Sequence, residues 1–138
     1  MKKTTSLLAT ILFSILTSFG QTGTTKEIPT KDGMFCGKVG ESGKTGGNYT
    51  LAELKNCDWK ITSVDTSYTV TEFRMSLVPK DDSYKYSEQE VKGNTIPETY
   101  RNQILTHTRN VFLEYIKAVN KKGESVLVKP IAVRIHLD

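Results

Sequence analysis

The sequence holds few of the side chains that carry catalytic chemistry. It contains only two histidines and two cysteines among 138 residues. Neither His107 nor His136 lies in a metal-ligand spacing such as HExxH or beside a nucleophile motif. A nucleophilic mechanism needs a nucleophile, a base and a group that orients the base. The sequence therefore predicts no catalytic residue, metal site or cofactor. A glycosidase-like site, whose two carboxylates come together only in the folded chain, is still an alternative.

Long hydrophobic runs are missing as well. The run Leu7–Leu16 has about ten residues, half of the ~20 that a membrane-spanning helix needs. Lys2 and Lys3 precede it and small residues follow it, which is the layout of a cleavable secretory signal. We expect residues 1–20 to be a signal peptide that is cut between Gly20 and Gln21. The mature protein would then be periplasmic or secreted and would not span a membrane.

No strong excess of one charge remains without the signal. The full chain has 19 basic and 15 acidic residues, and the signal removes Lys2 and Lys3 but no acid. The mature part keeps 17 basic and 15 acidic residues, scattered as on an ordinary solvated surface. The sequence thus gives no indication of nucleic-acid binding. The Gly-rich stretch 40–47 (GESGKTGG) lacks the strand, helix and spacing of a phosphate-binding loop.

The two cysteines, Cys36 and Cys57, both lie in the mature part. In an exported chain an even, minimal pair indicates a disulfide. Closing a loop of about twenty residues would add roughly 3 kcal/mol on the chain-entropy model. The alternative is two buried free thiols. A redox role is not indicated because the pair is not a CxxC motif.

The mature chain has the length of one domain. Residues 21–35 are mostly polar, with Gly and Pro, and we expect them to be a flexible leader. We place the folded domain at residues 36–138. Thr50 and Glu53 have the spacing of a capping box, which indicates a short helical turn.

Strand-like alternation begins at Trp59. In the run 67–78, the pattern places Thr69, Thr71, Phe73, Met75 and Leu77 on one face. We expect one short helix at about 97–105, with Pro97 in its first turn and Tyr100, Ile104 and Leu105 on one face.

Residues 111–137 predict a C-terminal β-hairpin that turns at Asn120–Gly123. Pro130 interrupts the return strand and marks a bulge, an edge or a change of sheet. His136 falls on the outward side of that strand. Short strands with frequent turns and no βαβ alternation favour a mostly β, immunoglobulin-like sandwich.

Several segments resemble the C-terminal domain of the gliding-motility protein GldM. Residues 114–118 (EYIKA), the turn 120–124 and the closing strand 128–135 are similar to the end of that domain. Residues 59–64 (WKITSV) are similar to one of its strands, and the Gly-rich segment 43–54 is similar to its beginning. The hairpin is the most specific of these similarities.

The resemblance covers most of residues 37–138 and implies a GldM C-terminal-type β-sandwich, as found in a gliding-motility and type 9 secretion component of Bacteroidetes. That domain binds envelope proteins and provides no catalytic residues to transfer. The linker between Leu54 and Trp59 is shorter than in the family, and residues 106–110 lack its usual Gly. With a signal peptide in place of the anchoring helix and stalk, we expect this chain not to be the motor subunit itself.

Three functions follow as hypotheses. The first is an exported, non-catalytic interaction module of the bacterial envelope that binds a protein partner through sheet edges or loops. The second is a small secreted glycan-binding protein or hydrolase, with a site built from scattered carboxylates and tyrosines. The third is a fragment of an envelope signalling receptor.

Overall fold

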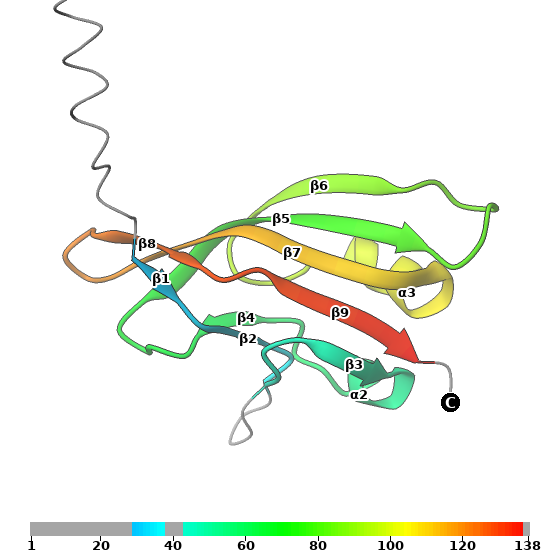
Figure 1. The fold of residues 1–138 in the computed structure, drawn as a ribbon, viewed down its shortest axis with the longest axis horizontal. Helices are drawn as coiled ribbons and strands as arrows, with labels where there is room; N and C mark the ends of the chain where they lie inside the picture. The colour runs from blue at the N-terminus through cyan, green and yellow to red at the C-terminus, as the bar shows by residue number, and fades with distance from the viewer. Residues whose placement is uncertain (1–28, 38–42, 137–138) are drawn as a thin grey trace, which may run out of the picture.

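The computed structural model describes residues 29–37 and 43–136. The signal peptide expected at 1–20, its cut between Gly20 and Gln21, and most of the expected leader lie outside these residues. The described part contains nine strands and two helices (Figure 1). The elements are β1 (Thr30–Lys31), β2 (Gly33–Phe35), β3 (Gly47–Thr50), α2 (Leu51–Lys55), β4 (Ile61–Ser63), β5 (Thr69–Pro79), β6 (Ser87–Lys92), α3 (Glu98–His107), β7 (Thr108–Val119), β8 (Ser125–Val128) and β9 (Ile131–His136).

Seven strands form one curled sheet around the two long strands β5 and β7. The order is β1-β8-β7-β5-β6, and β9 also pairs with β7 and carries β3 on its far side. The pairs β1–β8 and β3–β9 are parallel, whereas the others in this sheet are antiparallel. β2 and β4 make a separate two-stranded antiparallel sheet. In Figure 1 this small sheet lies below β5, β7 and β8, and the helices lie toward one end.

The prediction of a mostly β chain is confirmed. An immunoglobulin-like sandwich is not what the strand pairing shows, because seven of the nine described strands belong to one sheet. The β5 and β7 strands, of 11 and 12 residues, are long enough to curl around the core. The core is one continuous cluster that includes Trp59 and Leu54 as well as residues of both sheets.

The predicted C-terminal hairpin is confirmed, and Pro130 divides its return strand into β8 and β9. Both segments pair with β7 in a single register, since Ile116 faces Val128 and Leu113 faces Ile131. Proline has no amide hydrogen to donate to a ladder, so pairing stops at this point. Beyond it the sheet forks, because β8 continues to β1 and β9 continues to β3.

Both helical segments form where the sequence indicates them. The Thr50 side chain accepts from the Glu53 amide, and the Glu53 side chain accepts from the Thr50 amide, which completes the capping box of α2. The expected helix at 97–105 is α3, which begins after Pro97 and ends two residues later than predicted. Its expected apolar face is confirmed, because Ile104 is buried with Tyr100 and Leu105 packed beside the core.

The prediction that residues 21–35 form a flexible leader is wrong for residues 30–35. Thr30–Lys31 and Gly33–Phe35 are strands, and the Phe35 side chain is only 1% exposed. Polar composition predicts the wrong structure here because pairing with β8 and β4 provides hydrogen-bond partners for the backbone of these residues. A single large aromatic side chain then contributes the buried apolar area.

Gly33 allows this segment to approach the hairpin closely. A Cβ atom at this position would overlap the side chain of Val128. We expect Gly33→Ala to lower the free energy of unfolding by about 1–3 kcal/mol, as overpacked core sites do. Urea unfolding followed by circular dichroism measures this. Gly123→Ala is the comparison for backbone strain without overlap, because its φ is +80° but a Cβ there meets nothing within 4 Å. An unchanged unfolding midpoint for Gly33→Ala would contradict the packing of β2 against β8.

Candidate functional site

Two of the three register shifts between β5 and β7 lie close together and act in opposite directions. Arg74 faces Glu114 and Glu72 faces Lys117, so Tyr115 and Ile116 together oppose the single residue between Glu72 and Arg74. One extra residue therefore lies on β7. Further along, Val70 faces Ala118, so Thr71 is the extra residue on β5. The second bulge restores the register that the first one shifted.

After each bulge, the other set of alternating side chains faces the core. On β7 the buried side chains are Val111 and Leu113 before the bulge, but Ile116 and Ala118 after it. Because side chains alternate with period two, this change needs one inserted residue. Tyr115 is that residue, and it points away from the core.

Tyr115 combines exposure with an unusual backbone. Its φ is 50°, in the left-handed region that bulky side chains rarely adopt, at a typical cost of about 1–3 kcal/mol. Cys36 and Trp59 are the other non-glycine residues with positive φ in the described part, and neither is exposed. The Tyr115 side chain is 64% exposed. A large aromatic group is thus held in solvent by a costly conformation.

Charged side chains surround this ring. The Arg74 guanidinium carbon lies 4.7 Å from the ring centroid, in a cation–π arrangement. Arg74 also lies 3.8 Å from the Glu90 carboxylate. Glu72 pairs with Lys92, and a hydrogen bond from that ammonium holds the pKa of Glu72 below its ordinary value. We call Glu72, Arg74, Glu90, Lys92, Tyr115 and Lys117 the bulge patch.

The bulge patch contains a small depression of about 60 Å³, bordered by Glu72, Arg74, Glu90 and Tyr115. It is too small to enclose a substrate, since small-molecule sites usually measure about 300–1,000 Å³. Its chemistry is that of a contact surface: an aromatic ring, a guanidinium and paired charges.

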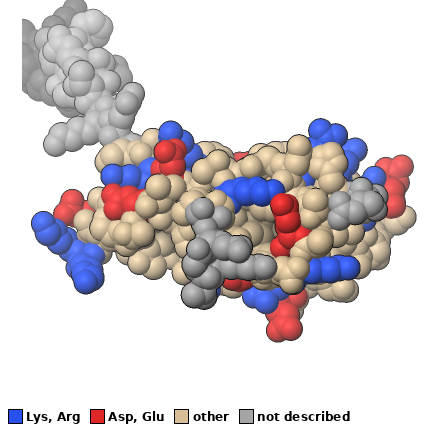
Figure 2. Space-filling model, turned by 90° about the horizontal axis from the view of Figure 1, so that it is seen from below, with Lys and Arg blue, Asp and Glu red and all other residues tan. Residues whose placement is uncertain are grey.

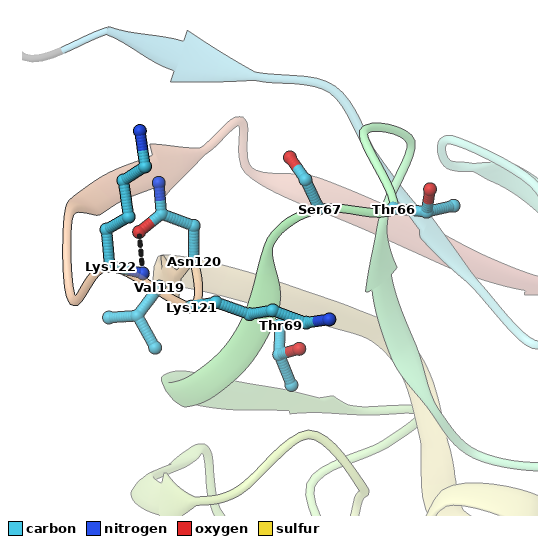
Figure 3. A pocket seen from close by; sticks show the side chains of 7 residues that line it. All are labelled: Thr66, Ser67, Thr69, Val119, Asn120, Lys121 and Lys122. Atoms are coloured by element: carbon cyan, nitrogen blue, oxygen red, sulfur yellow. Dashed lines mark hydrogen bonds between the residues drawn. The ribbon is translucent and has the colours of Figure 1, made fainter.

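A second feature lies where the β7–β8 turn meets the segment between β4 and β5. This hollow of about 650 Å³ has Asn120, Lys121 and Lys122 on the turn side and the hydroxyl residues Thr66, Ser67 and Thr69 opposite, as Figure 3 shows. A neighbouring hollow of about 240 Å³ shares Thr66 and Thr69 with it. We call the two hollows together the hairpin cleft.

Acidic and basic side chains are interspersed on the face that Figure 2 shows. Basic side chains project at the left end, where Figure 1 places the β7–β8 turn. The bulge patch and the hairpin cleft share no bordering residue.

Cys36 and Cys57 form a disulfide, which resolves the choice between a bridge and free thiols. The bond joins the end of β2 to the segment after α2. Disulfides persist in oxidising compartments, so the bond fits a periplasmic or extracellular protein. Within the described ranges, no helix has the length and apolar character needed to cross a membrane.

The two histidines lie on different elements. His136 is exposed at the end of β9, on the predicted outward side. His107 ends α3 and stacks on Tyr84, with ring centroids 3.8 Å apart. Among residues 29–37 and 43–136, no three His, Cys, Asp or Glu side chains gather as a metal site.

Sequence reasoning missed both surfaces. A signal for the bulge was present, because the apolar residues Val111 and Leu113 fall on one parity and Ile116 and Ala118 on the other. A strand with one buried face can accommodate both only with an insertion between them. The cleft has no such signal, since its walls come from segments about fifty residues apart. Comparison with protein-family models and with curated proteins found no match.

Proposed function

We propose that this chain is an exported, non-catalytic protein-interaction module of the bacterial envelope, with a domain of the GldM C-terminal type. The single observation that carries the proposal is Tyr115, an exposed aromatic residue in a costly conformation at the centre of the main sheet. Strained residues concentrate at functional positions because folding alone does not favour them. The disulfide is consistent with the exported location.

The chemistry of the bulge patch suits a protein partner. Tyrosine and arginine are the residues most often found at binding hot spots, together with tryptophan. The Tyr115 side chain loses little rotational freedom on binding, since it has two torsions and already stacks with Arg74. The paired charges around it match the polar rim of a typical interface.

The patch is a better candidate than the sheet edge at β6. Glu88, Glu90 and Lys92 alternate along that strand and are all exposed. Charged side chains on edge strands are a common means of preventing another strand from adding to the sheet. We therefore place the partner on the sheet face around Tyr115 and not along this edge.

The test is capture of envelope proteins by the purified domain, with wild type, Tyr115→Ala and Tyr84→Ala as baits. Tyr84 is 40% exposed and lies outside the bulge patch, so it controls for the loss of an exposed tyrosine. We expect one protein to be enriched by wild type and by Tyr84→Ala. Its affinity for Tyr115→Ala should fall at least tenfold, because hot-spot truncation typically costs 2 kcal/mol or more.

Stability measurements separate this role from a structural one. Glycine adopts positive φ without steric cost, so Tyr115→Gly should unfold at the same or a higher urea concentration than Tyr115→Ala. Both variants should fold and both should lose the partner. Equal capture by wild type and Tyr115→Ala, or no specific capture by wild type, would overturn the proposal.

A further inference from the structure

The hairpin cleft has firm walls. On the turn side, the Asn120 side-chain oxygen accepts from the amides of Lys122 and Glu124, at 3.0 and 2.9 Å. On the opposite side, an Asp65 carboxylate oxygen accepts from the amide and the hydroxyl of Ser67, at 3.1 and 2.6 Å. Each wall is a turn closed by its own hydrogen bonds, so little ordering is needed on binding.

The larger hollow is basic. Its only ionisable bordering side chains are Lys121 and Lys122, and neither forms an ion pair within the part of the chain that the structure describes. The nearby Asp65 is already engaged: Lys31 lies 3.1 Å away. Hydrogen bonds from Ser67 contribute most to holding the pKa of Asp65 below its ordinary value, and the hydrogen bond from Lys31 contributes less. Figure 3 shows the two side chains extending in different directions, Lys121 toward Thr69 and Lys122 beside Asn120, so an anion in the hollow would face the uncompensated ammonium group of one or the other.

The smaller hollow offers polar groups beside an aromatic ring. Tyr68, Asn94, Thr62 and Ser63 border it. Ser63 is 4% exposed, and its hydroxyl is the one buried side-chain oxygen without a hydrogen-bond partner among the described residues. Because this oxygen has almost no accessible surface, the side chains that the hollow offers to a ligand are those of Tyr68, Asn94 and Thr62.

We propose that the hairpin cleft binds an acidic disaccharide, a sugar pair that carries a carboxylate. Its anionic group would pair with the ammonium group of Lys121 or Lys122, and its hydroxyls would bond with the serine, threonine and asparagine side chains of the cleft. An acidic peptide fits less well. The amides of Lys122, Gly123 and Glu124 bond within the turn, so they leave no free backbone edge for a peptide to pair with. This site is separate from the bulge patch and does not depend on the proposed protein interaction.

The experiment is a titration of the ¹⁵N-labelled protein followed by NMR. The probes are digalacturonic acid, the neutral disaccharide maltose, inorganic phosphate and tetraglutamate. We expect digalacturonic acid to cause saturable shifts of the amides of residues 62–69 and 120–124, with a Kd in the range of about 0.1–1 mM. Maltose, phosphate and tetraglutamate should each bind at least tenfold more weakly.

Matched variants locate the site. The double variant Lys121→Gln, Lys122→Gln should bind digalacturonic acid at least tenfold more weakly, since hydrogen bonds to charged groups typically contribute about 1.5–3 kcal/mol. Lys55→Gln with Lys85→Gln removes the same charge from exposed positions outside the cleft and should leave the affinity unchanged.

Three results would overturn the assignment. The first is the absence of saturable shifts with digalacturonic acid at about 10 mM, tenfold the upper end of the expected Kd range. The second is equal affinity of the two double-lysine variants. The third is tighter binding of tetraglutamate or phosphate than of the disaccharide, which would indicate a peptide or a simple anion site.

Discussion

Phe35→Ala is expected to lower the free energy of unfolding by about 3–5 kcal/mol, as truncation of a buried phenylalanine does. The ring is 1% exposed and packs against Tyr49 and Trp59, with centroids 5.8 and 6.2 Å away. Its backbone amide also donates to Lys44, at 2.8 Å. The loss would leave a cavity between both sheets, and the surrounding aromatic rings can fill it only in part.

This substitution discriminates between the two descriptions of residues 30–35. A flexible leader would tolerate alanine at position 35 with no change in stability. Urea unfolding monitored by the fluorescence of Trp59 gives the midpoint and the slope. Val64→Ala is the control, because Val64 is 50% exposed and its truncation should change stability by less than about 0.5 kcal/mol. Similar midpoints for the two variants would show that Phe35 is not part of the core.

Removal of the disulfide is expected to cost about 3 kcal/mol, mainly because the unfolded chain gains freedom. Cys36 and Cys57 are 21 residues apart in the sequence, and the loop between them contains β3 and α2. The double variant Cys36→Ala, Cys57→Ala removes the bond without leaving a thiol. Its unfolding midpoint in urea should lie well below that of the oxidised wild type.

Reductant provides the internal control for this prediction. Dithiothreitol should lower the midpoint of the wild type toward that of the double variant and should leave the double variant unchanged. A wild-type midpoint that does not respond to dithiothreitol, together with free thiols in a labelling assay of the unfolded protein, would show that the bond does not form.

Elements with local signals follow from the residue pattern alone. Hydrogen bonds between residues three apart define the capping box of Thr50 and Glu53, and the turn at Asn120–Gly123 needs only its own residues and a glycine at positive φ. The same applies to α3, where Pro97 and one apolar face mark the helix. The interruption at Pro130 is also a local effect, because proline has no amide hydrogen to donate to the neighbouring strand.

The face that each residue of the long strands presents depends instead on pairing between distant strands. The alternation in 67–78 placed Thr69 and Thr71 with Phe73, but Val70 is buried and both threonines are exposed. The bulge at Thr71 turns the strand over, and it is needed because β7 has its own bulge at Tyr115. A parity rule applied to one strand cannot reveal an insertion that a partner strand imposes.

Both proposed surfaces depend on such long-range pairing. Tyr115 is exposed because two strands about forty residues apart in the sequence adjust their registers to each other. The hairpin cleft forms because the β7–β8 turn lies beside residues 66–69. Residue types and spacing predicted the strands, the helix and a possible disulfide. The position of each side chain relative to the core required the paired sheet, because burial is a property of the assembled layers and not of any one segment.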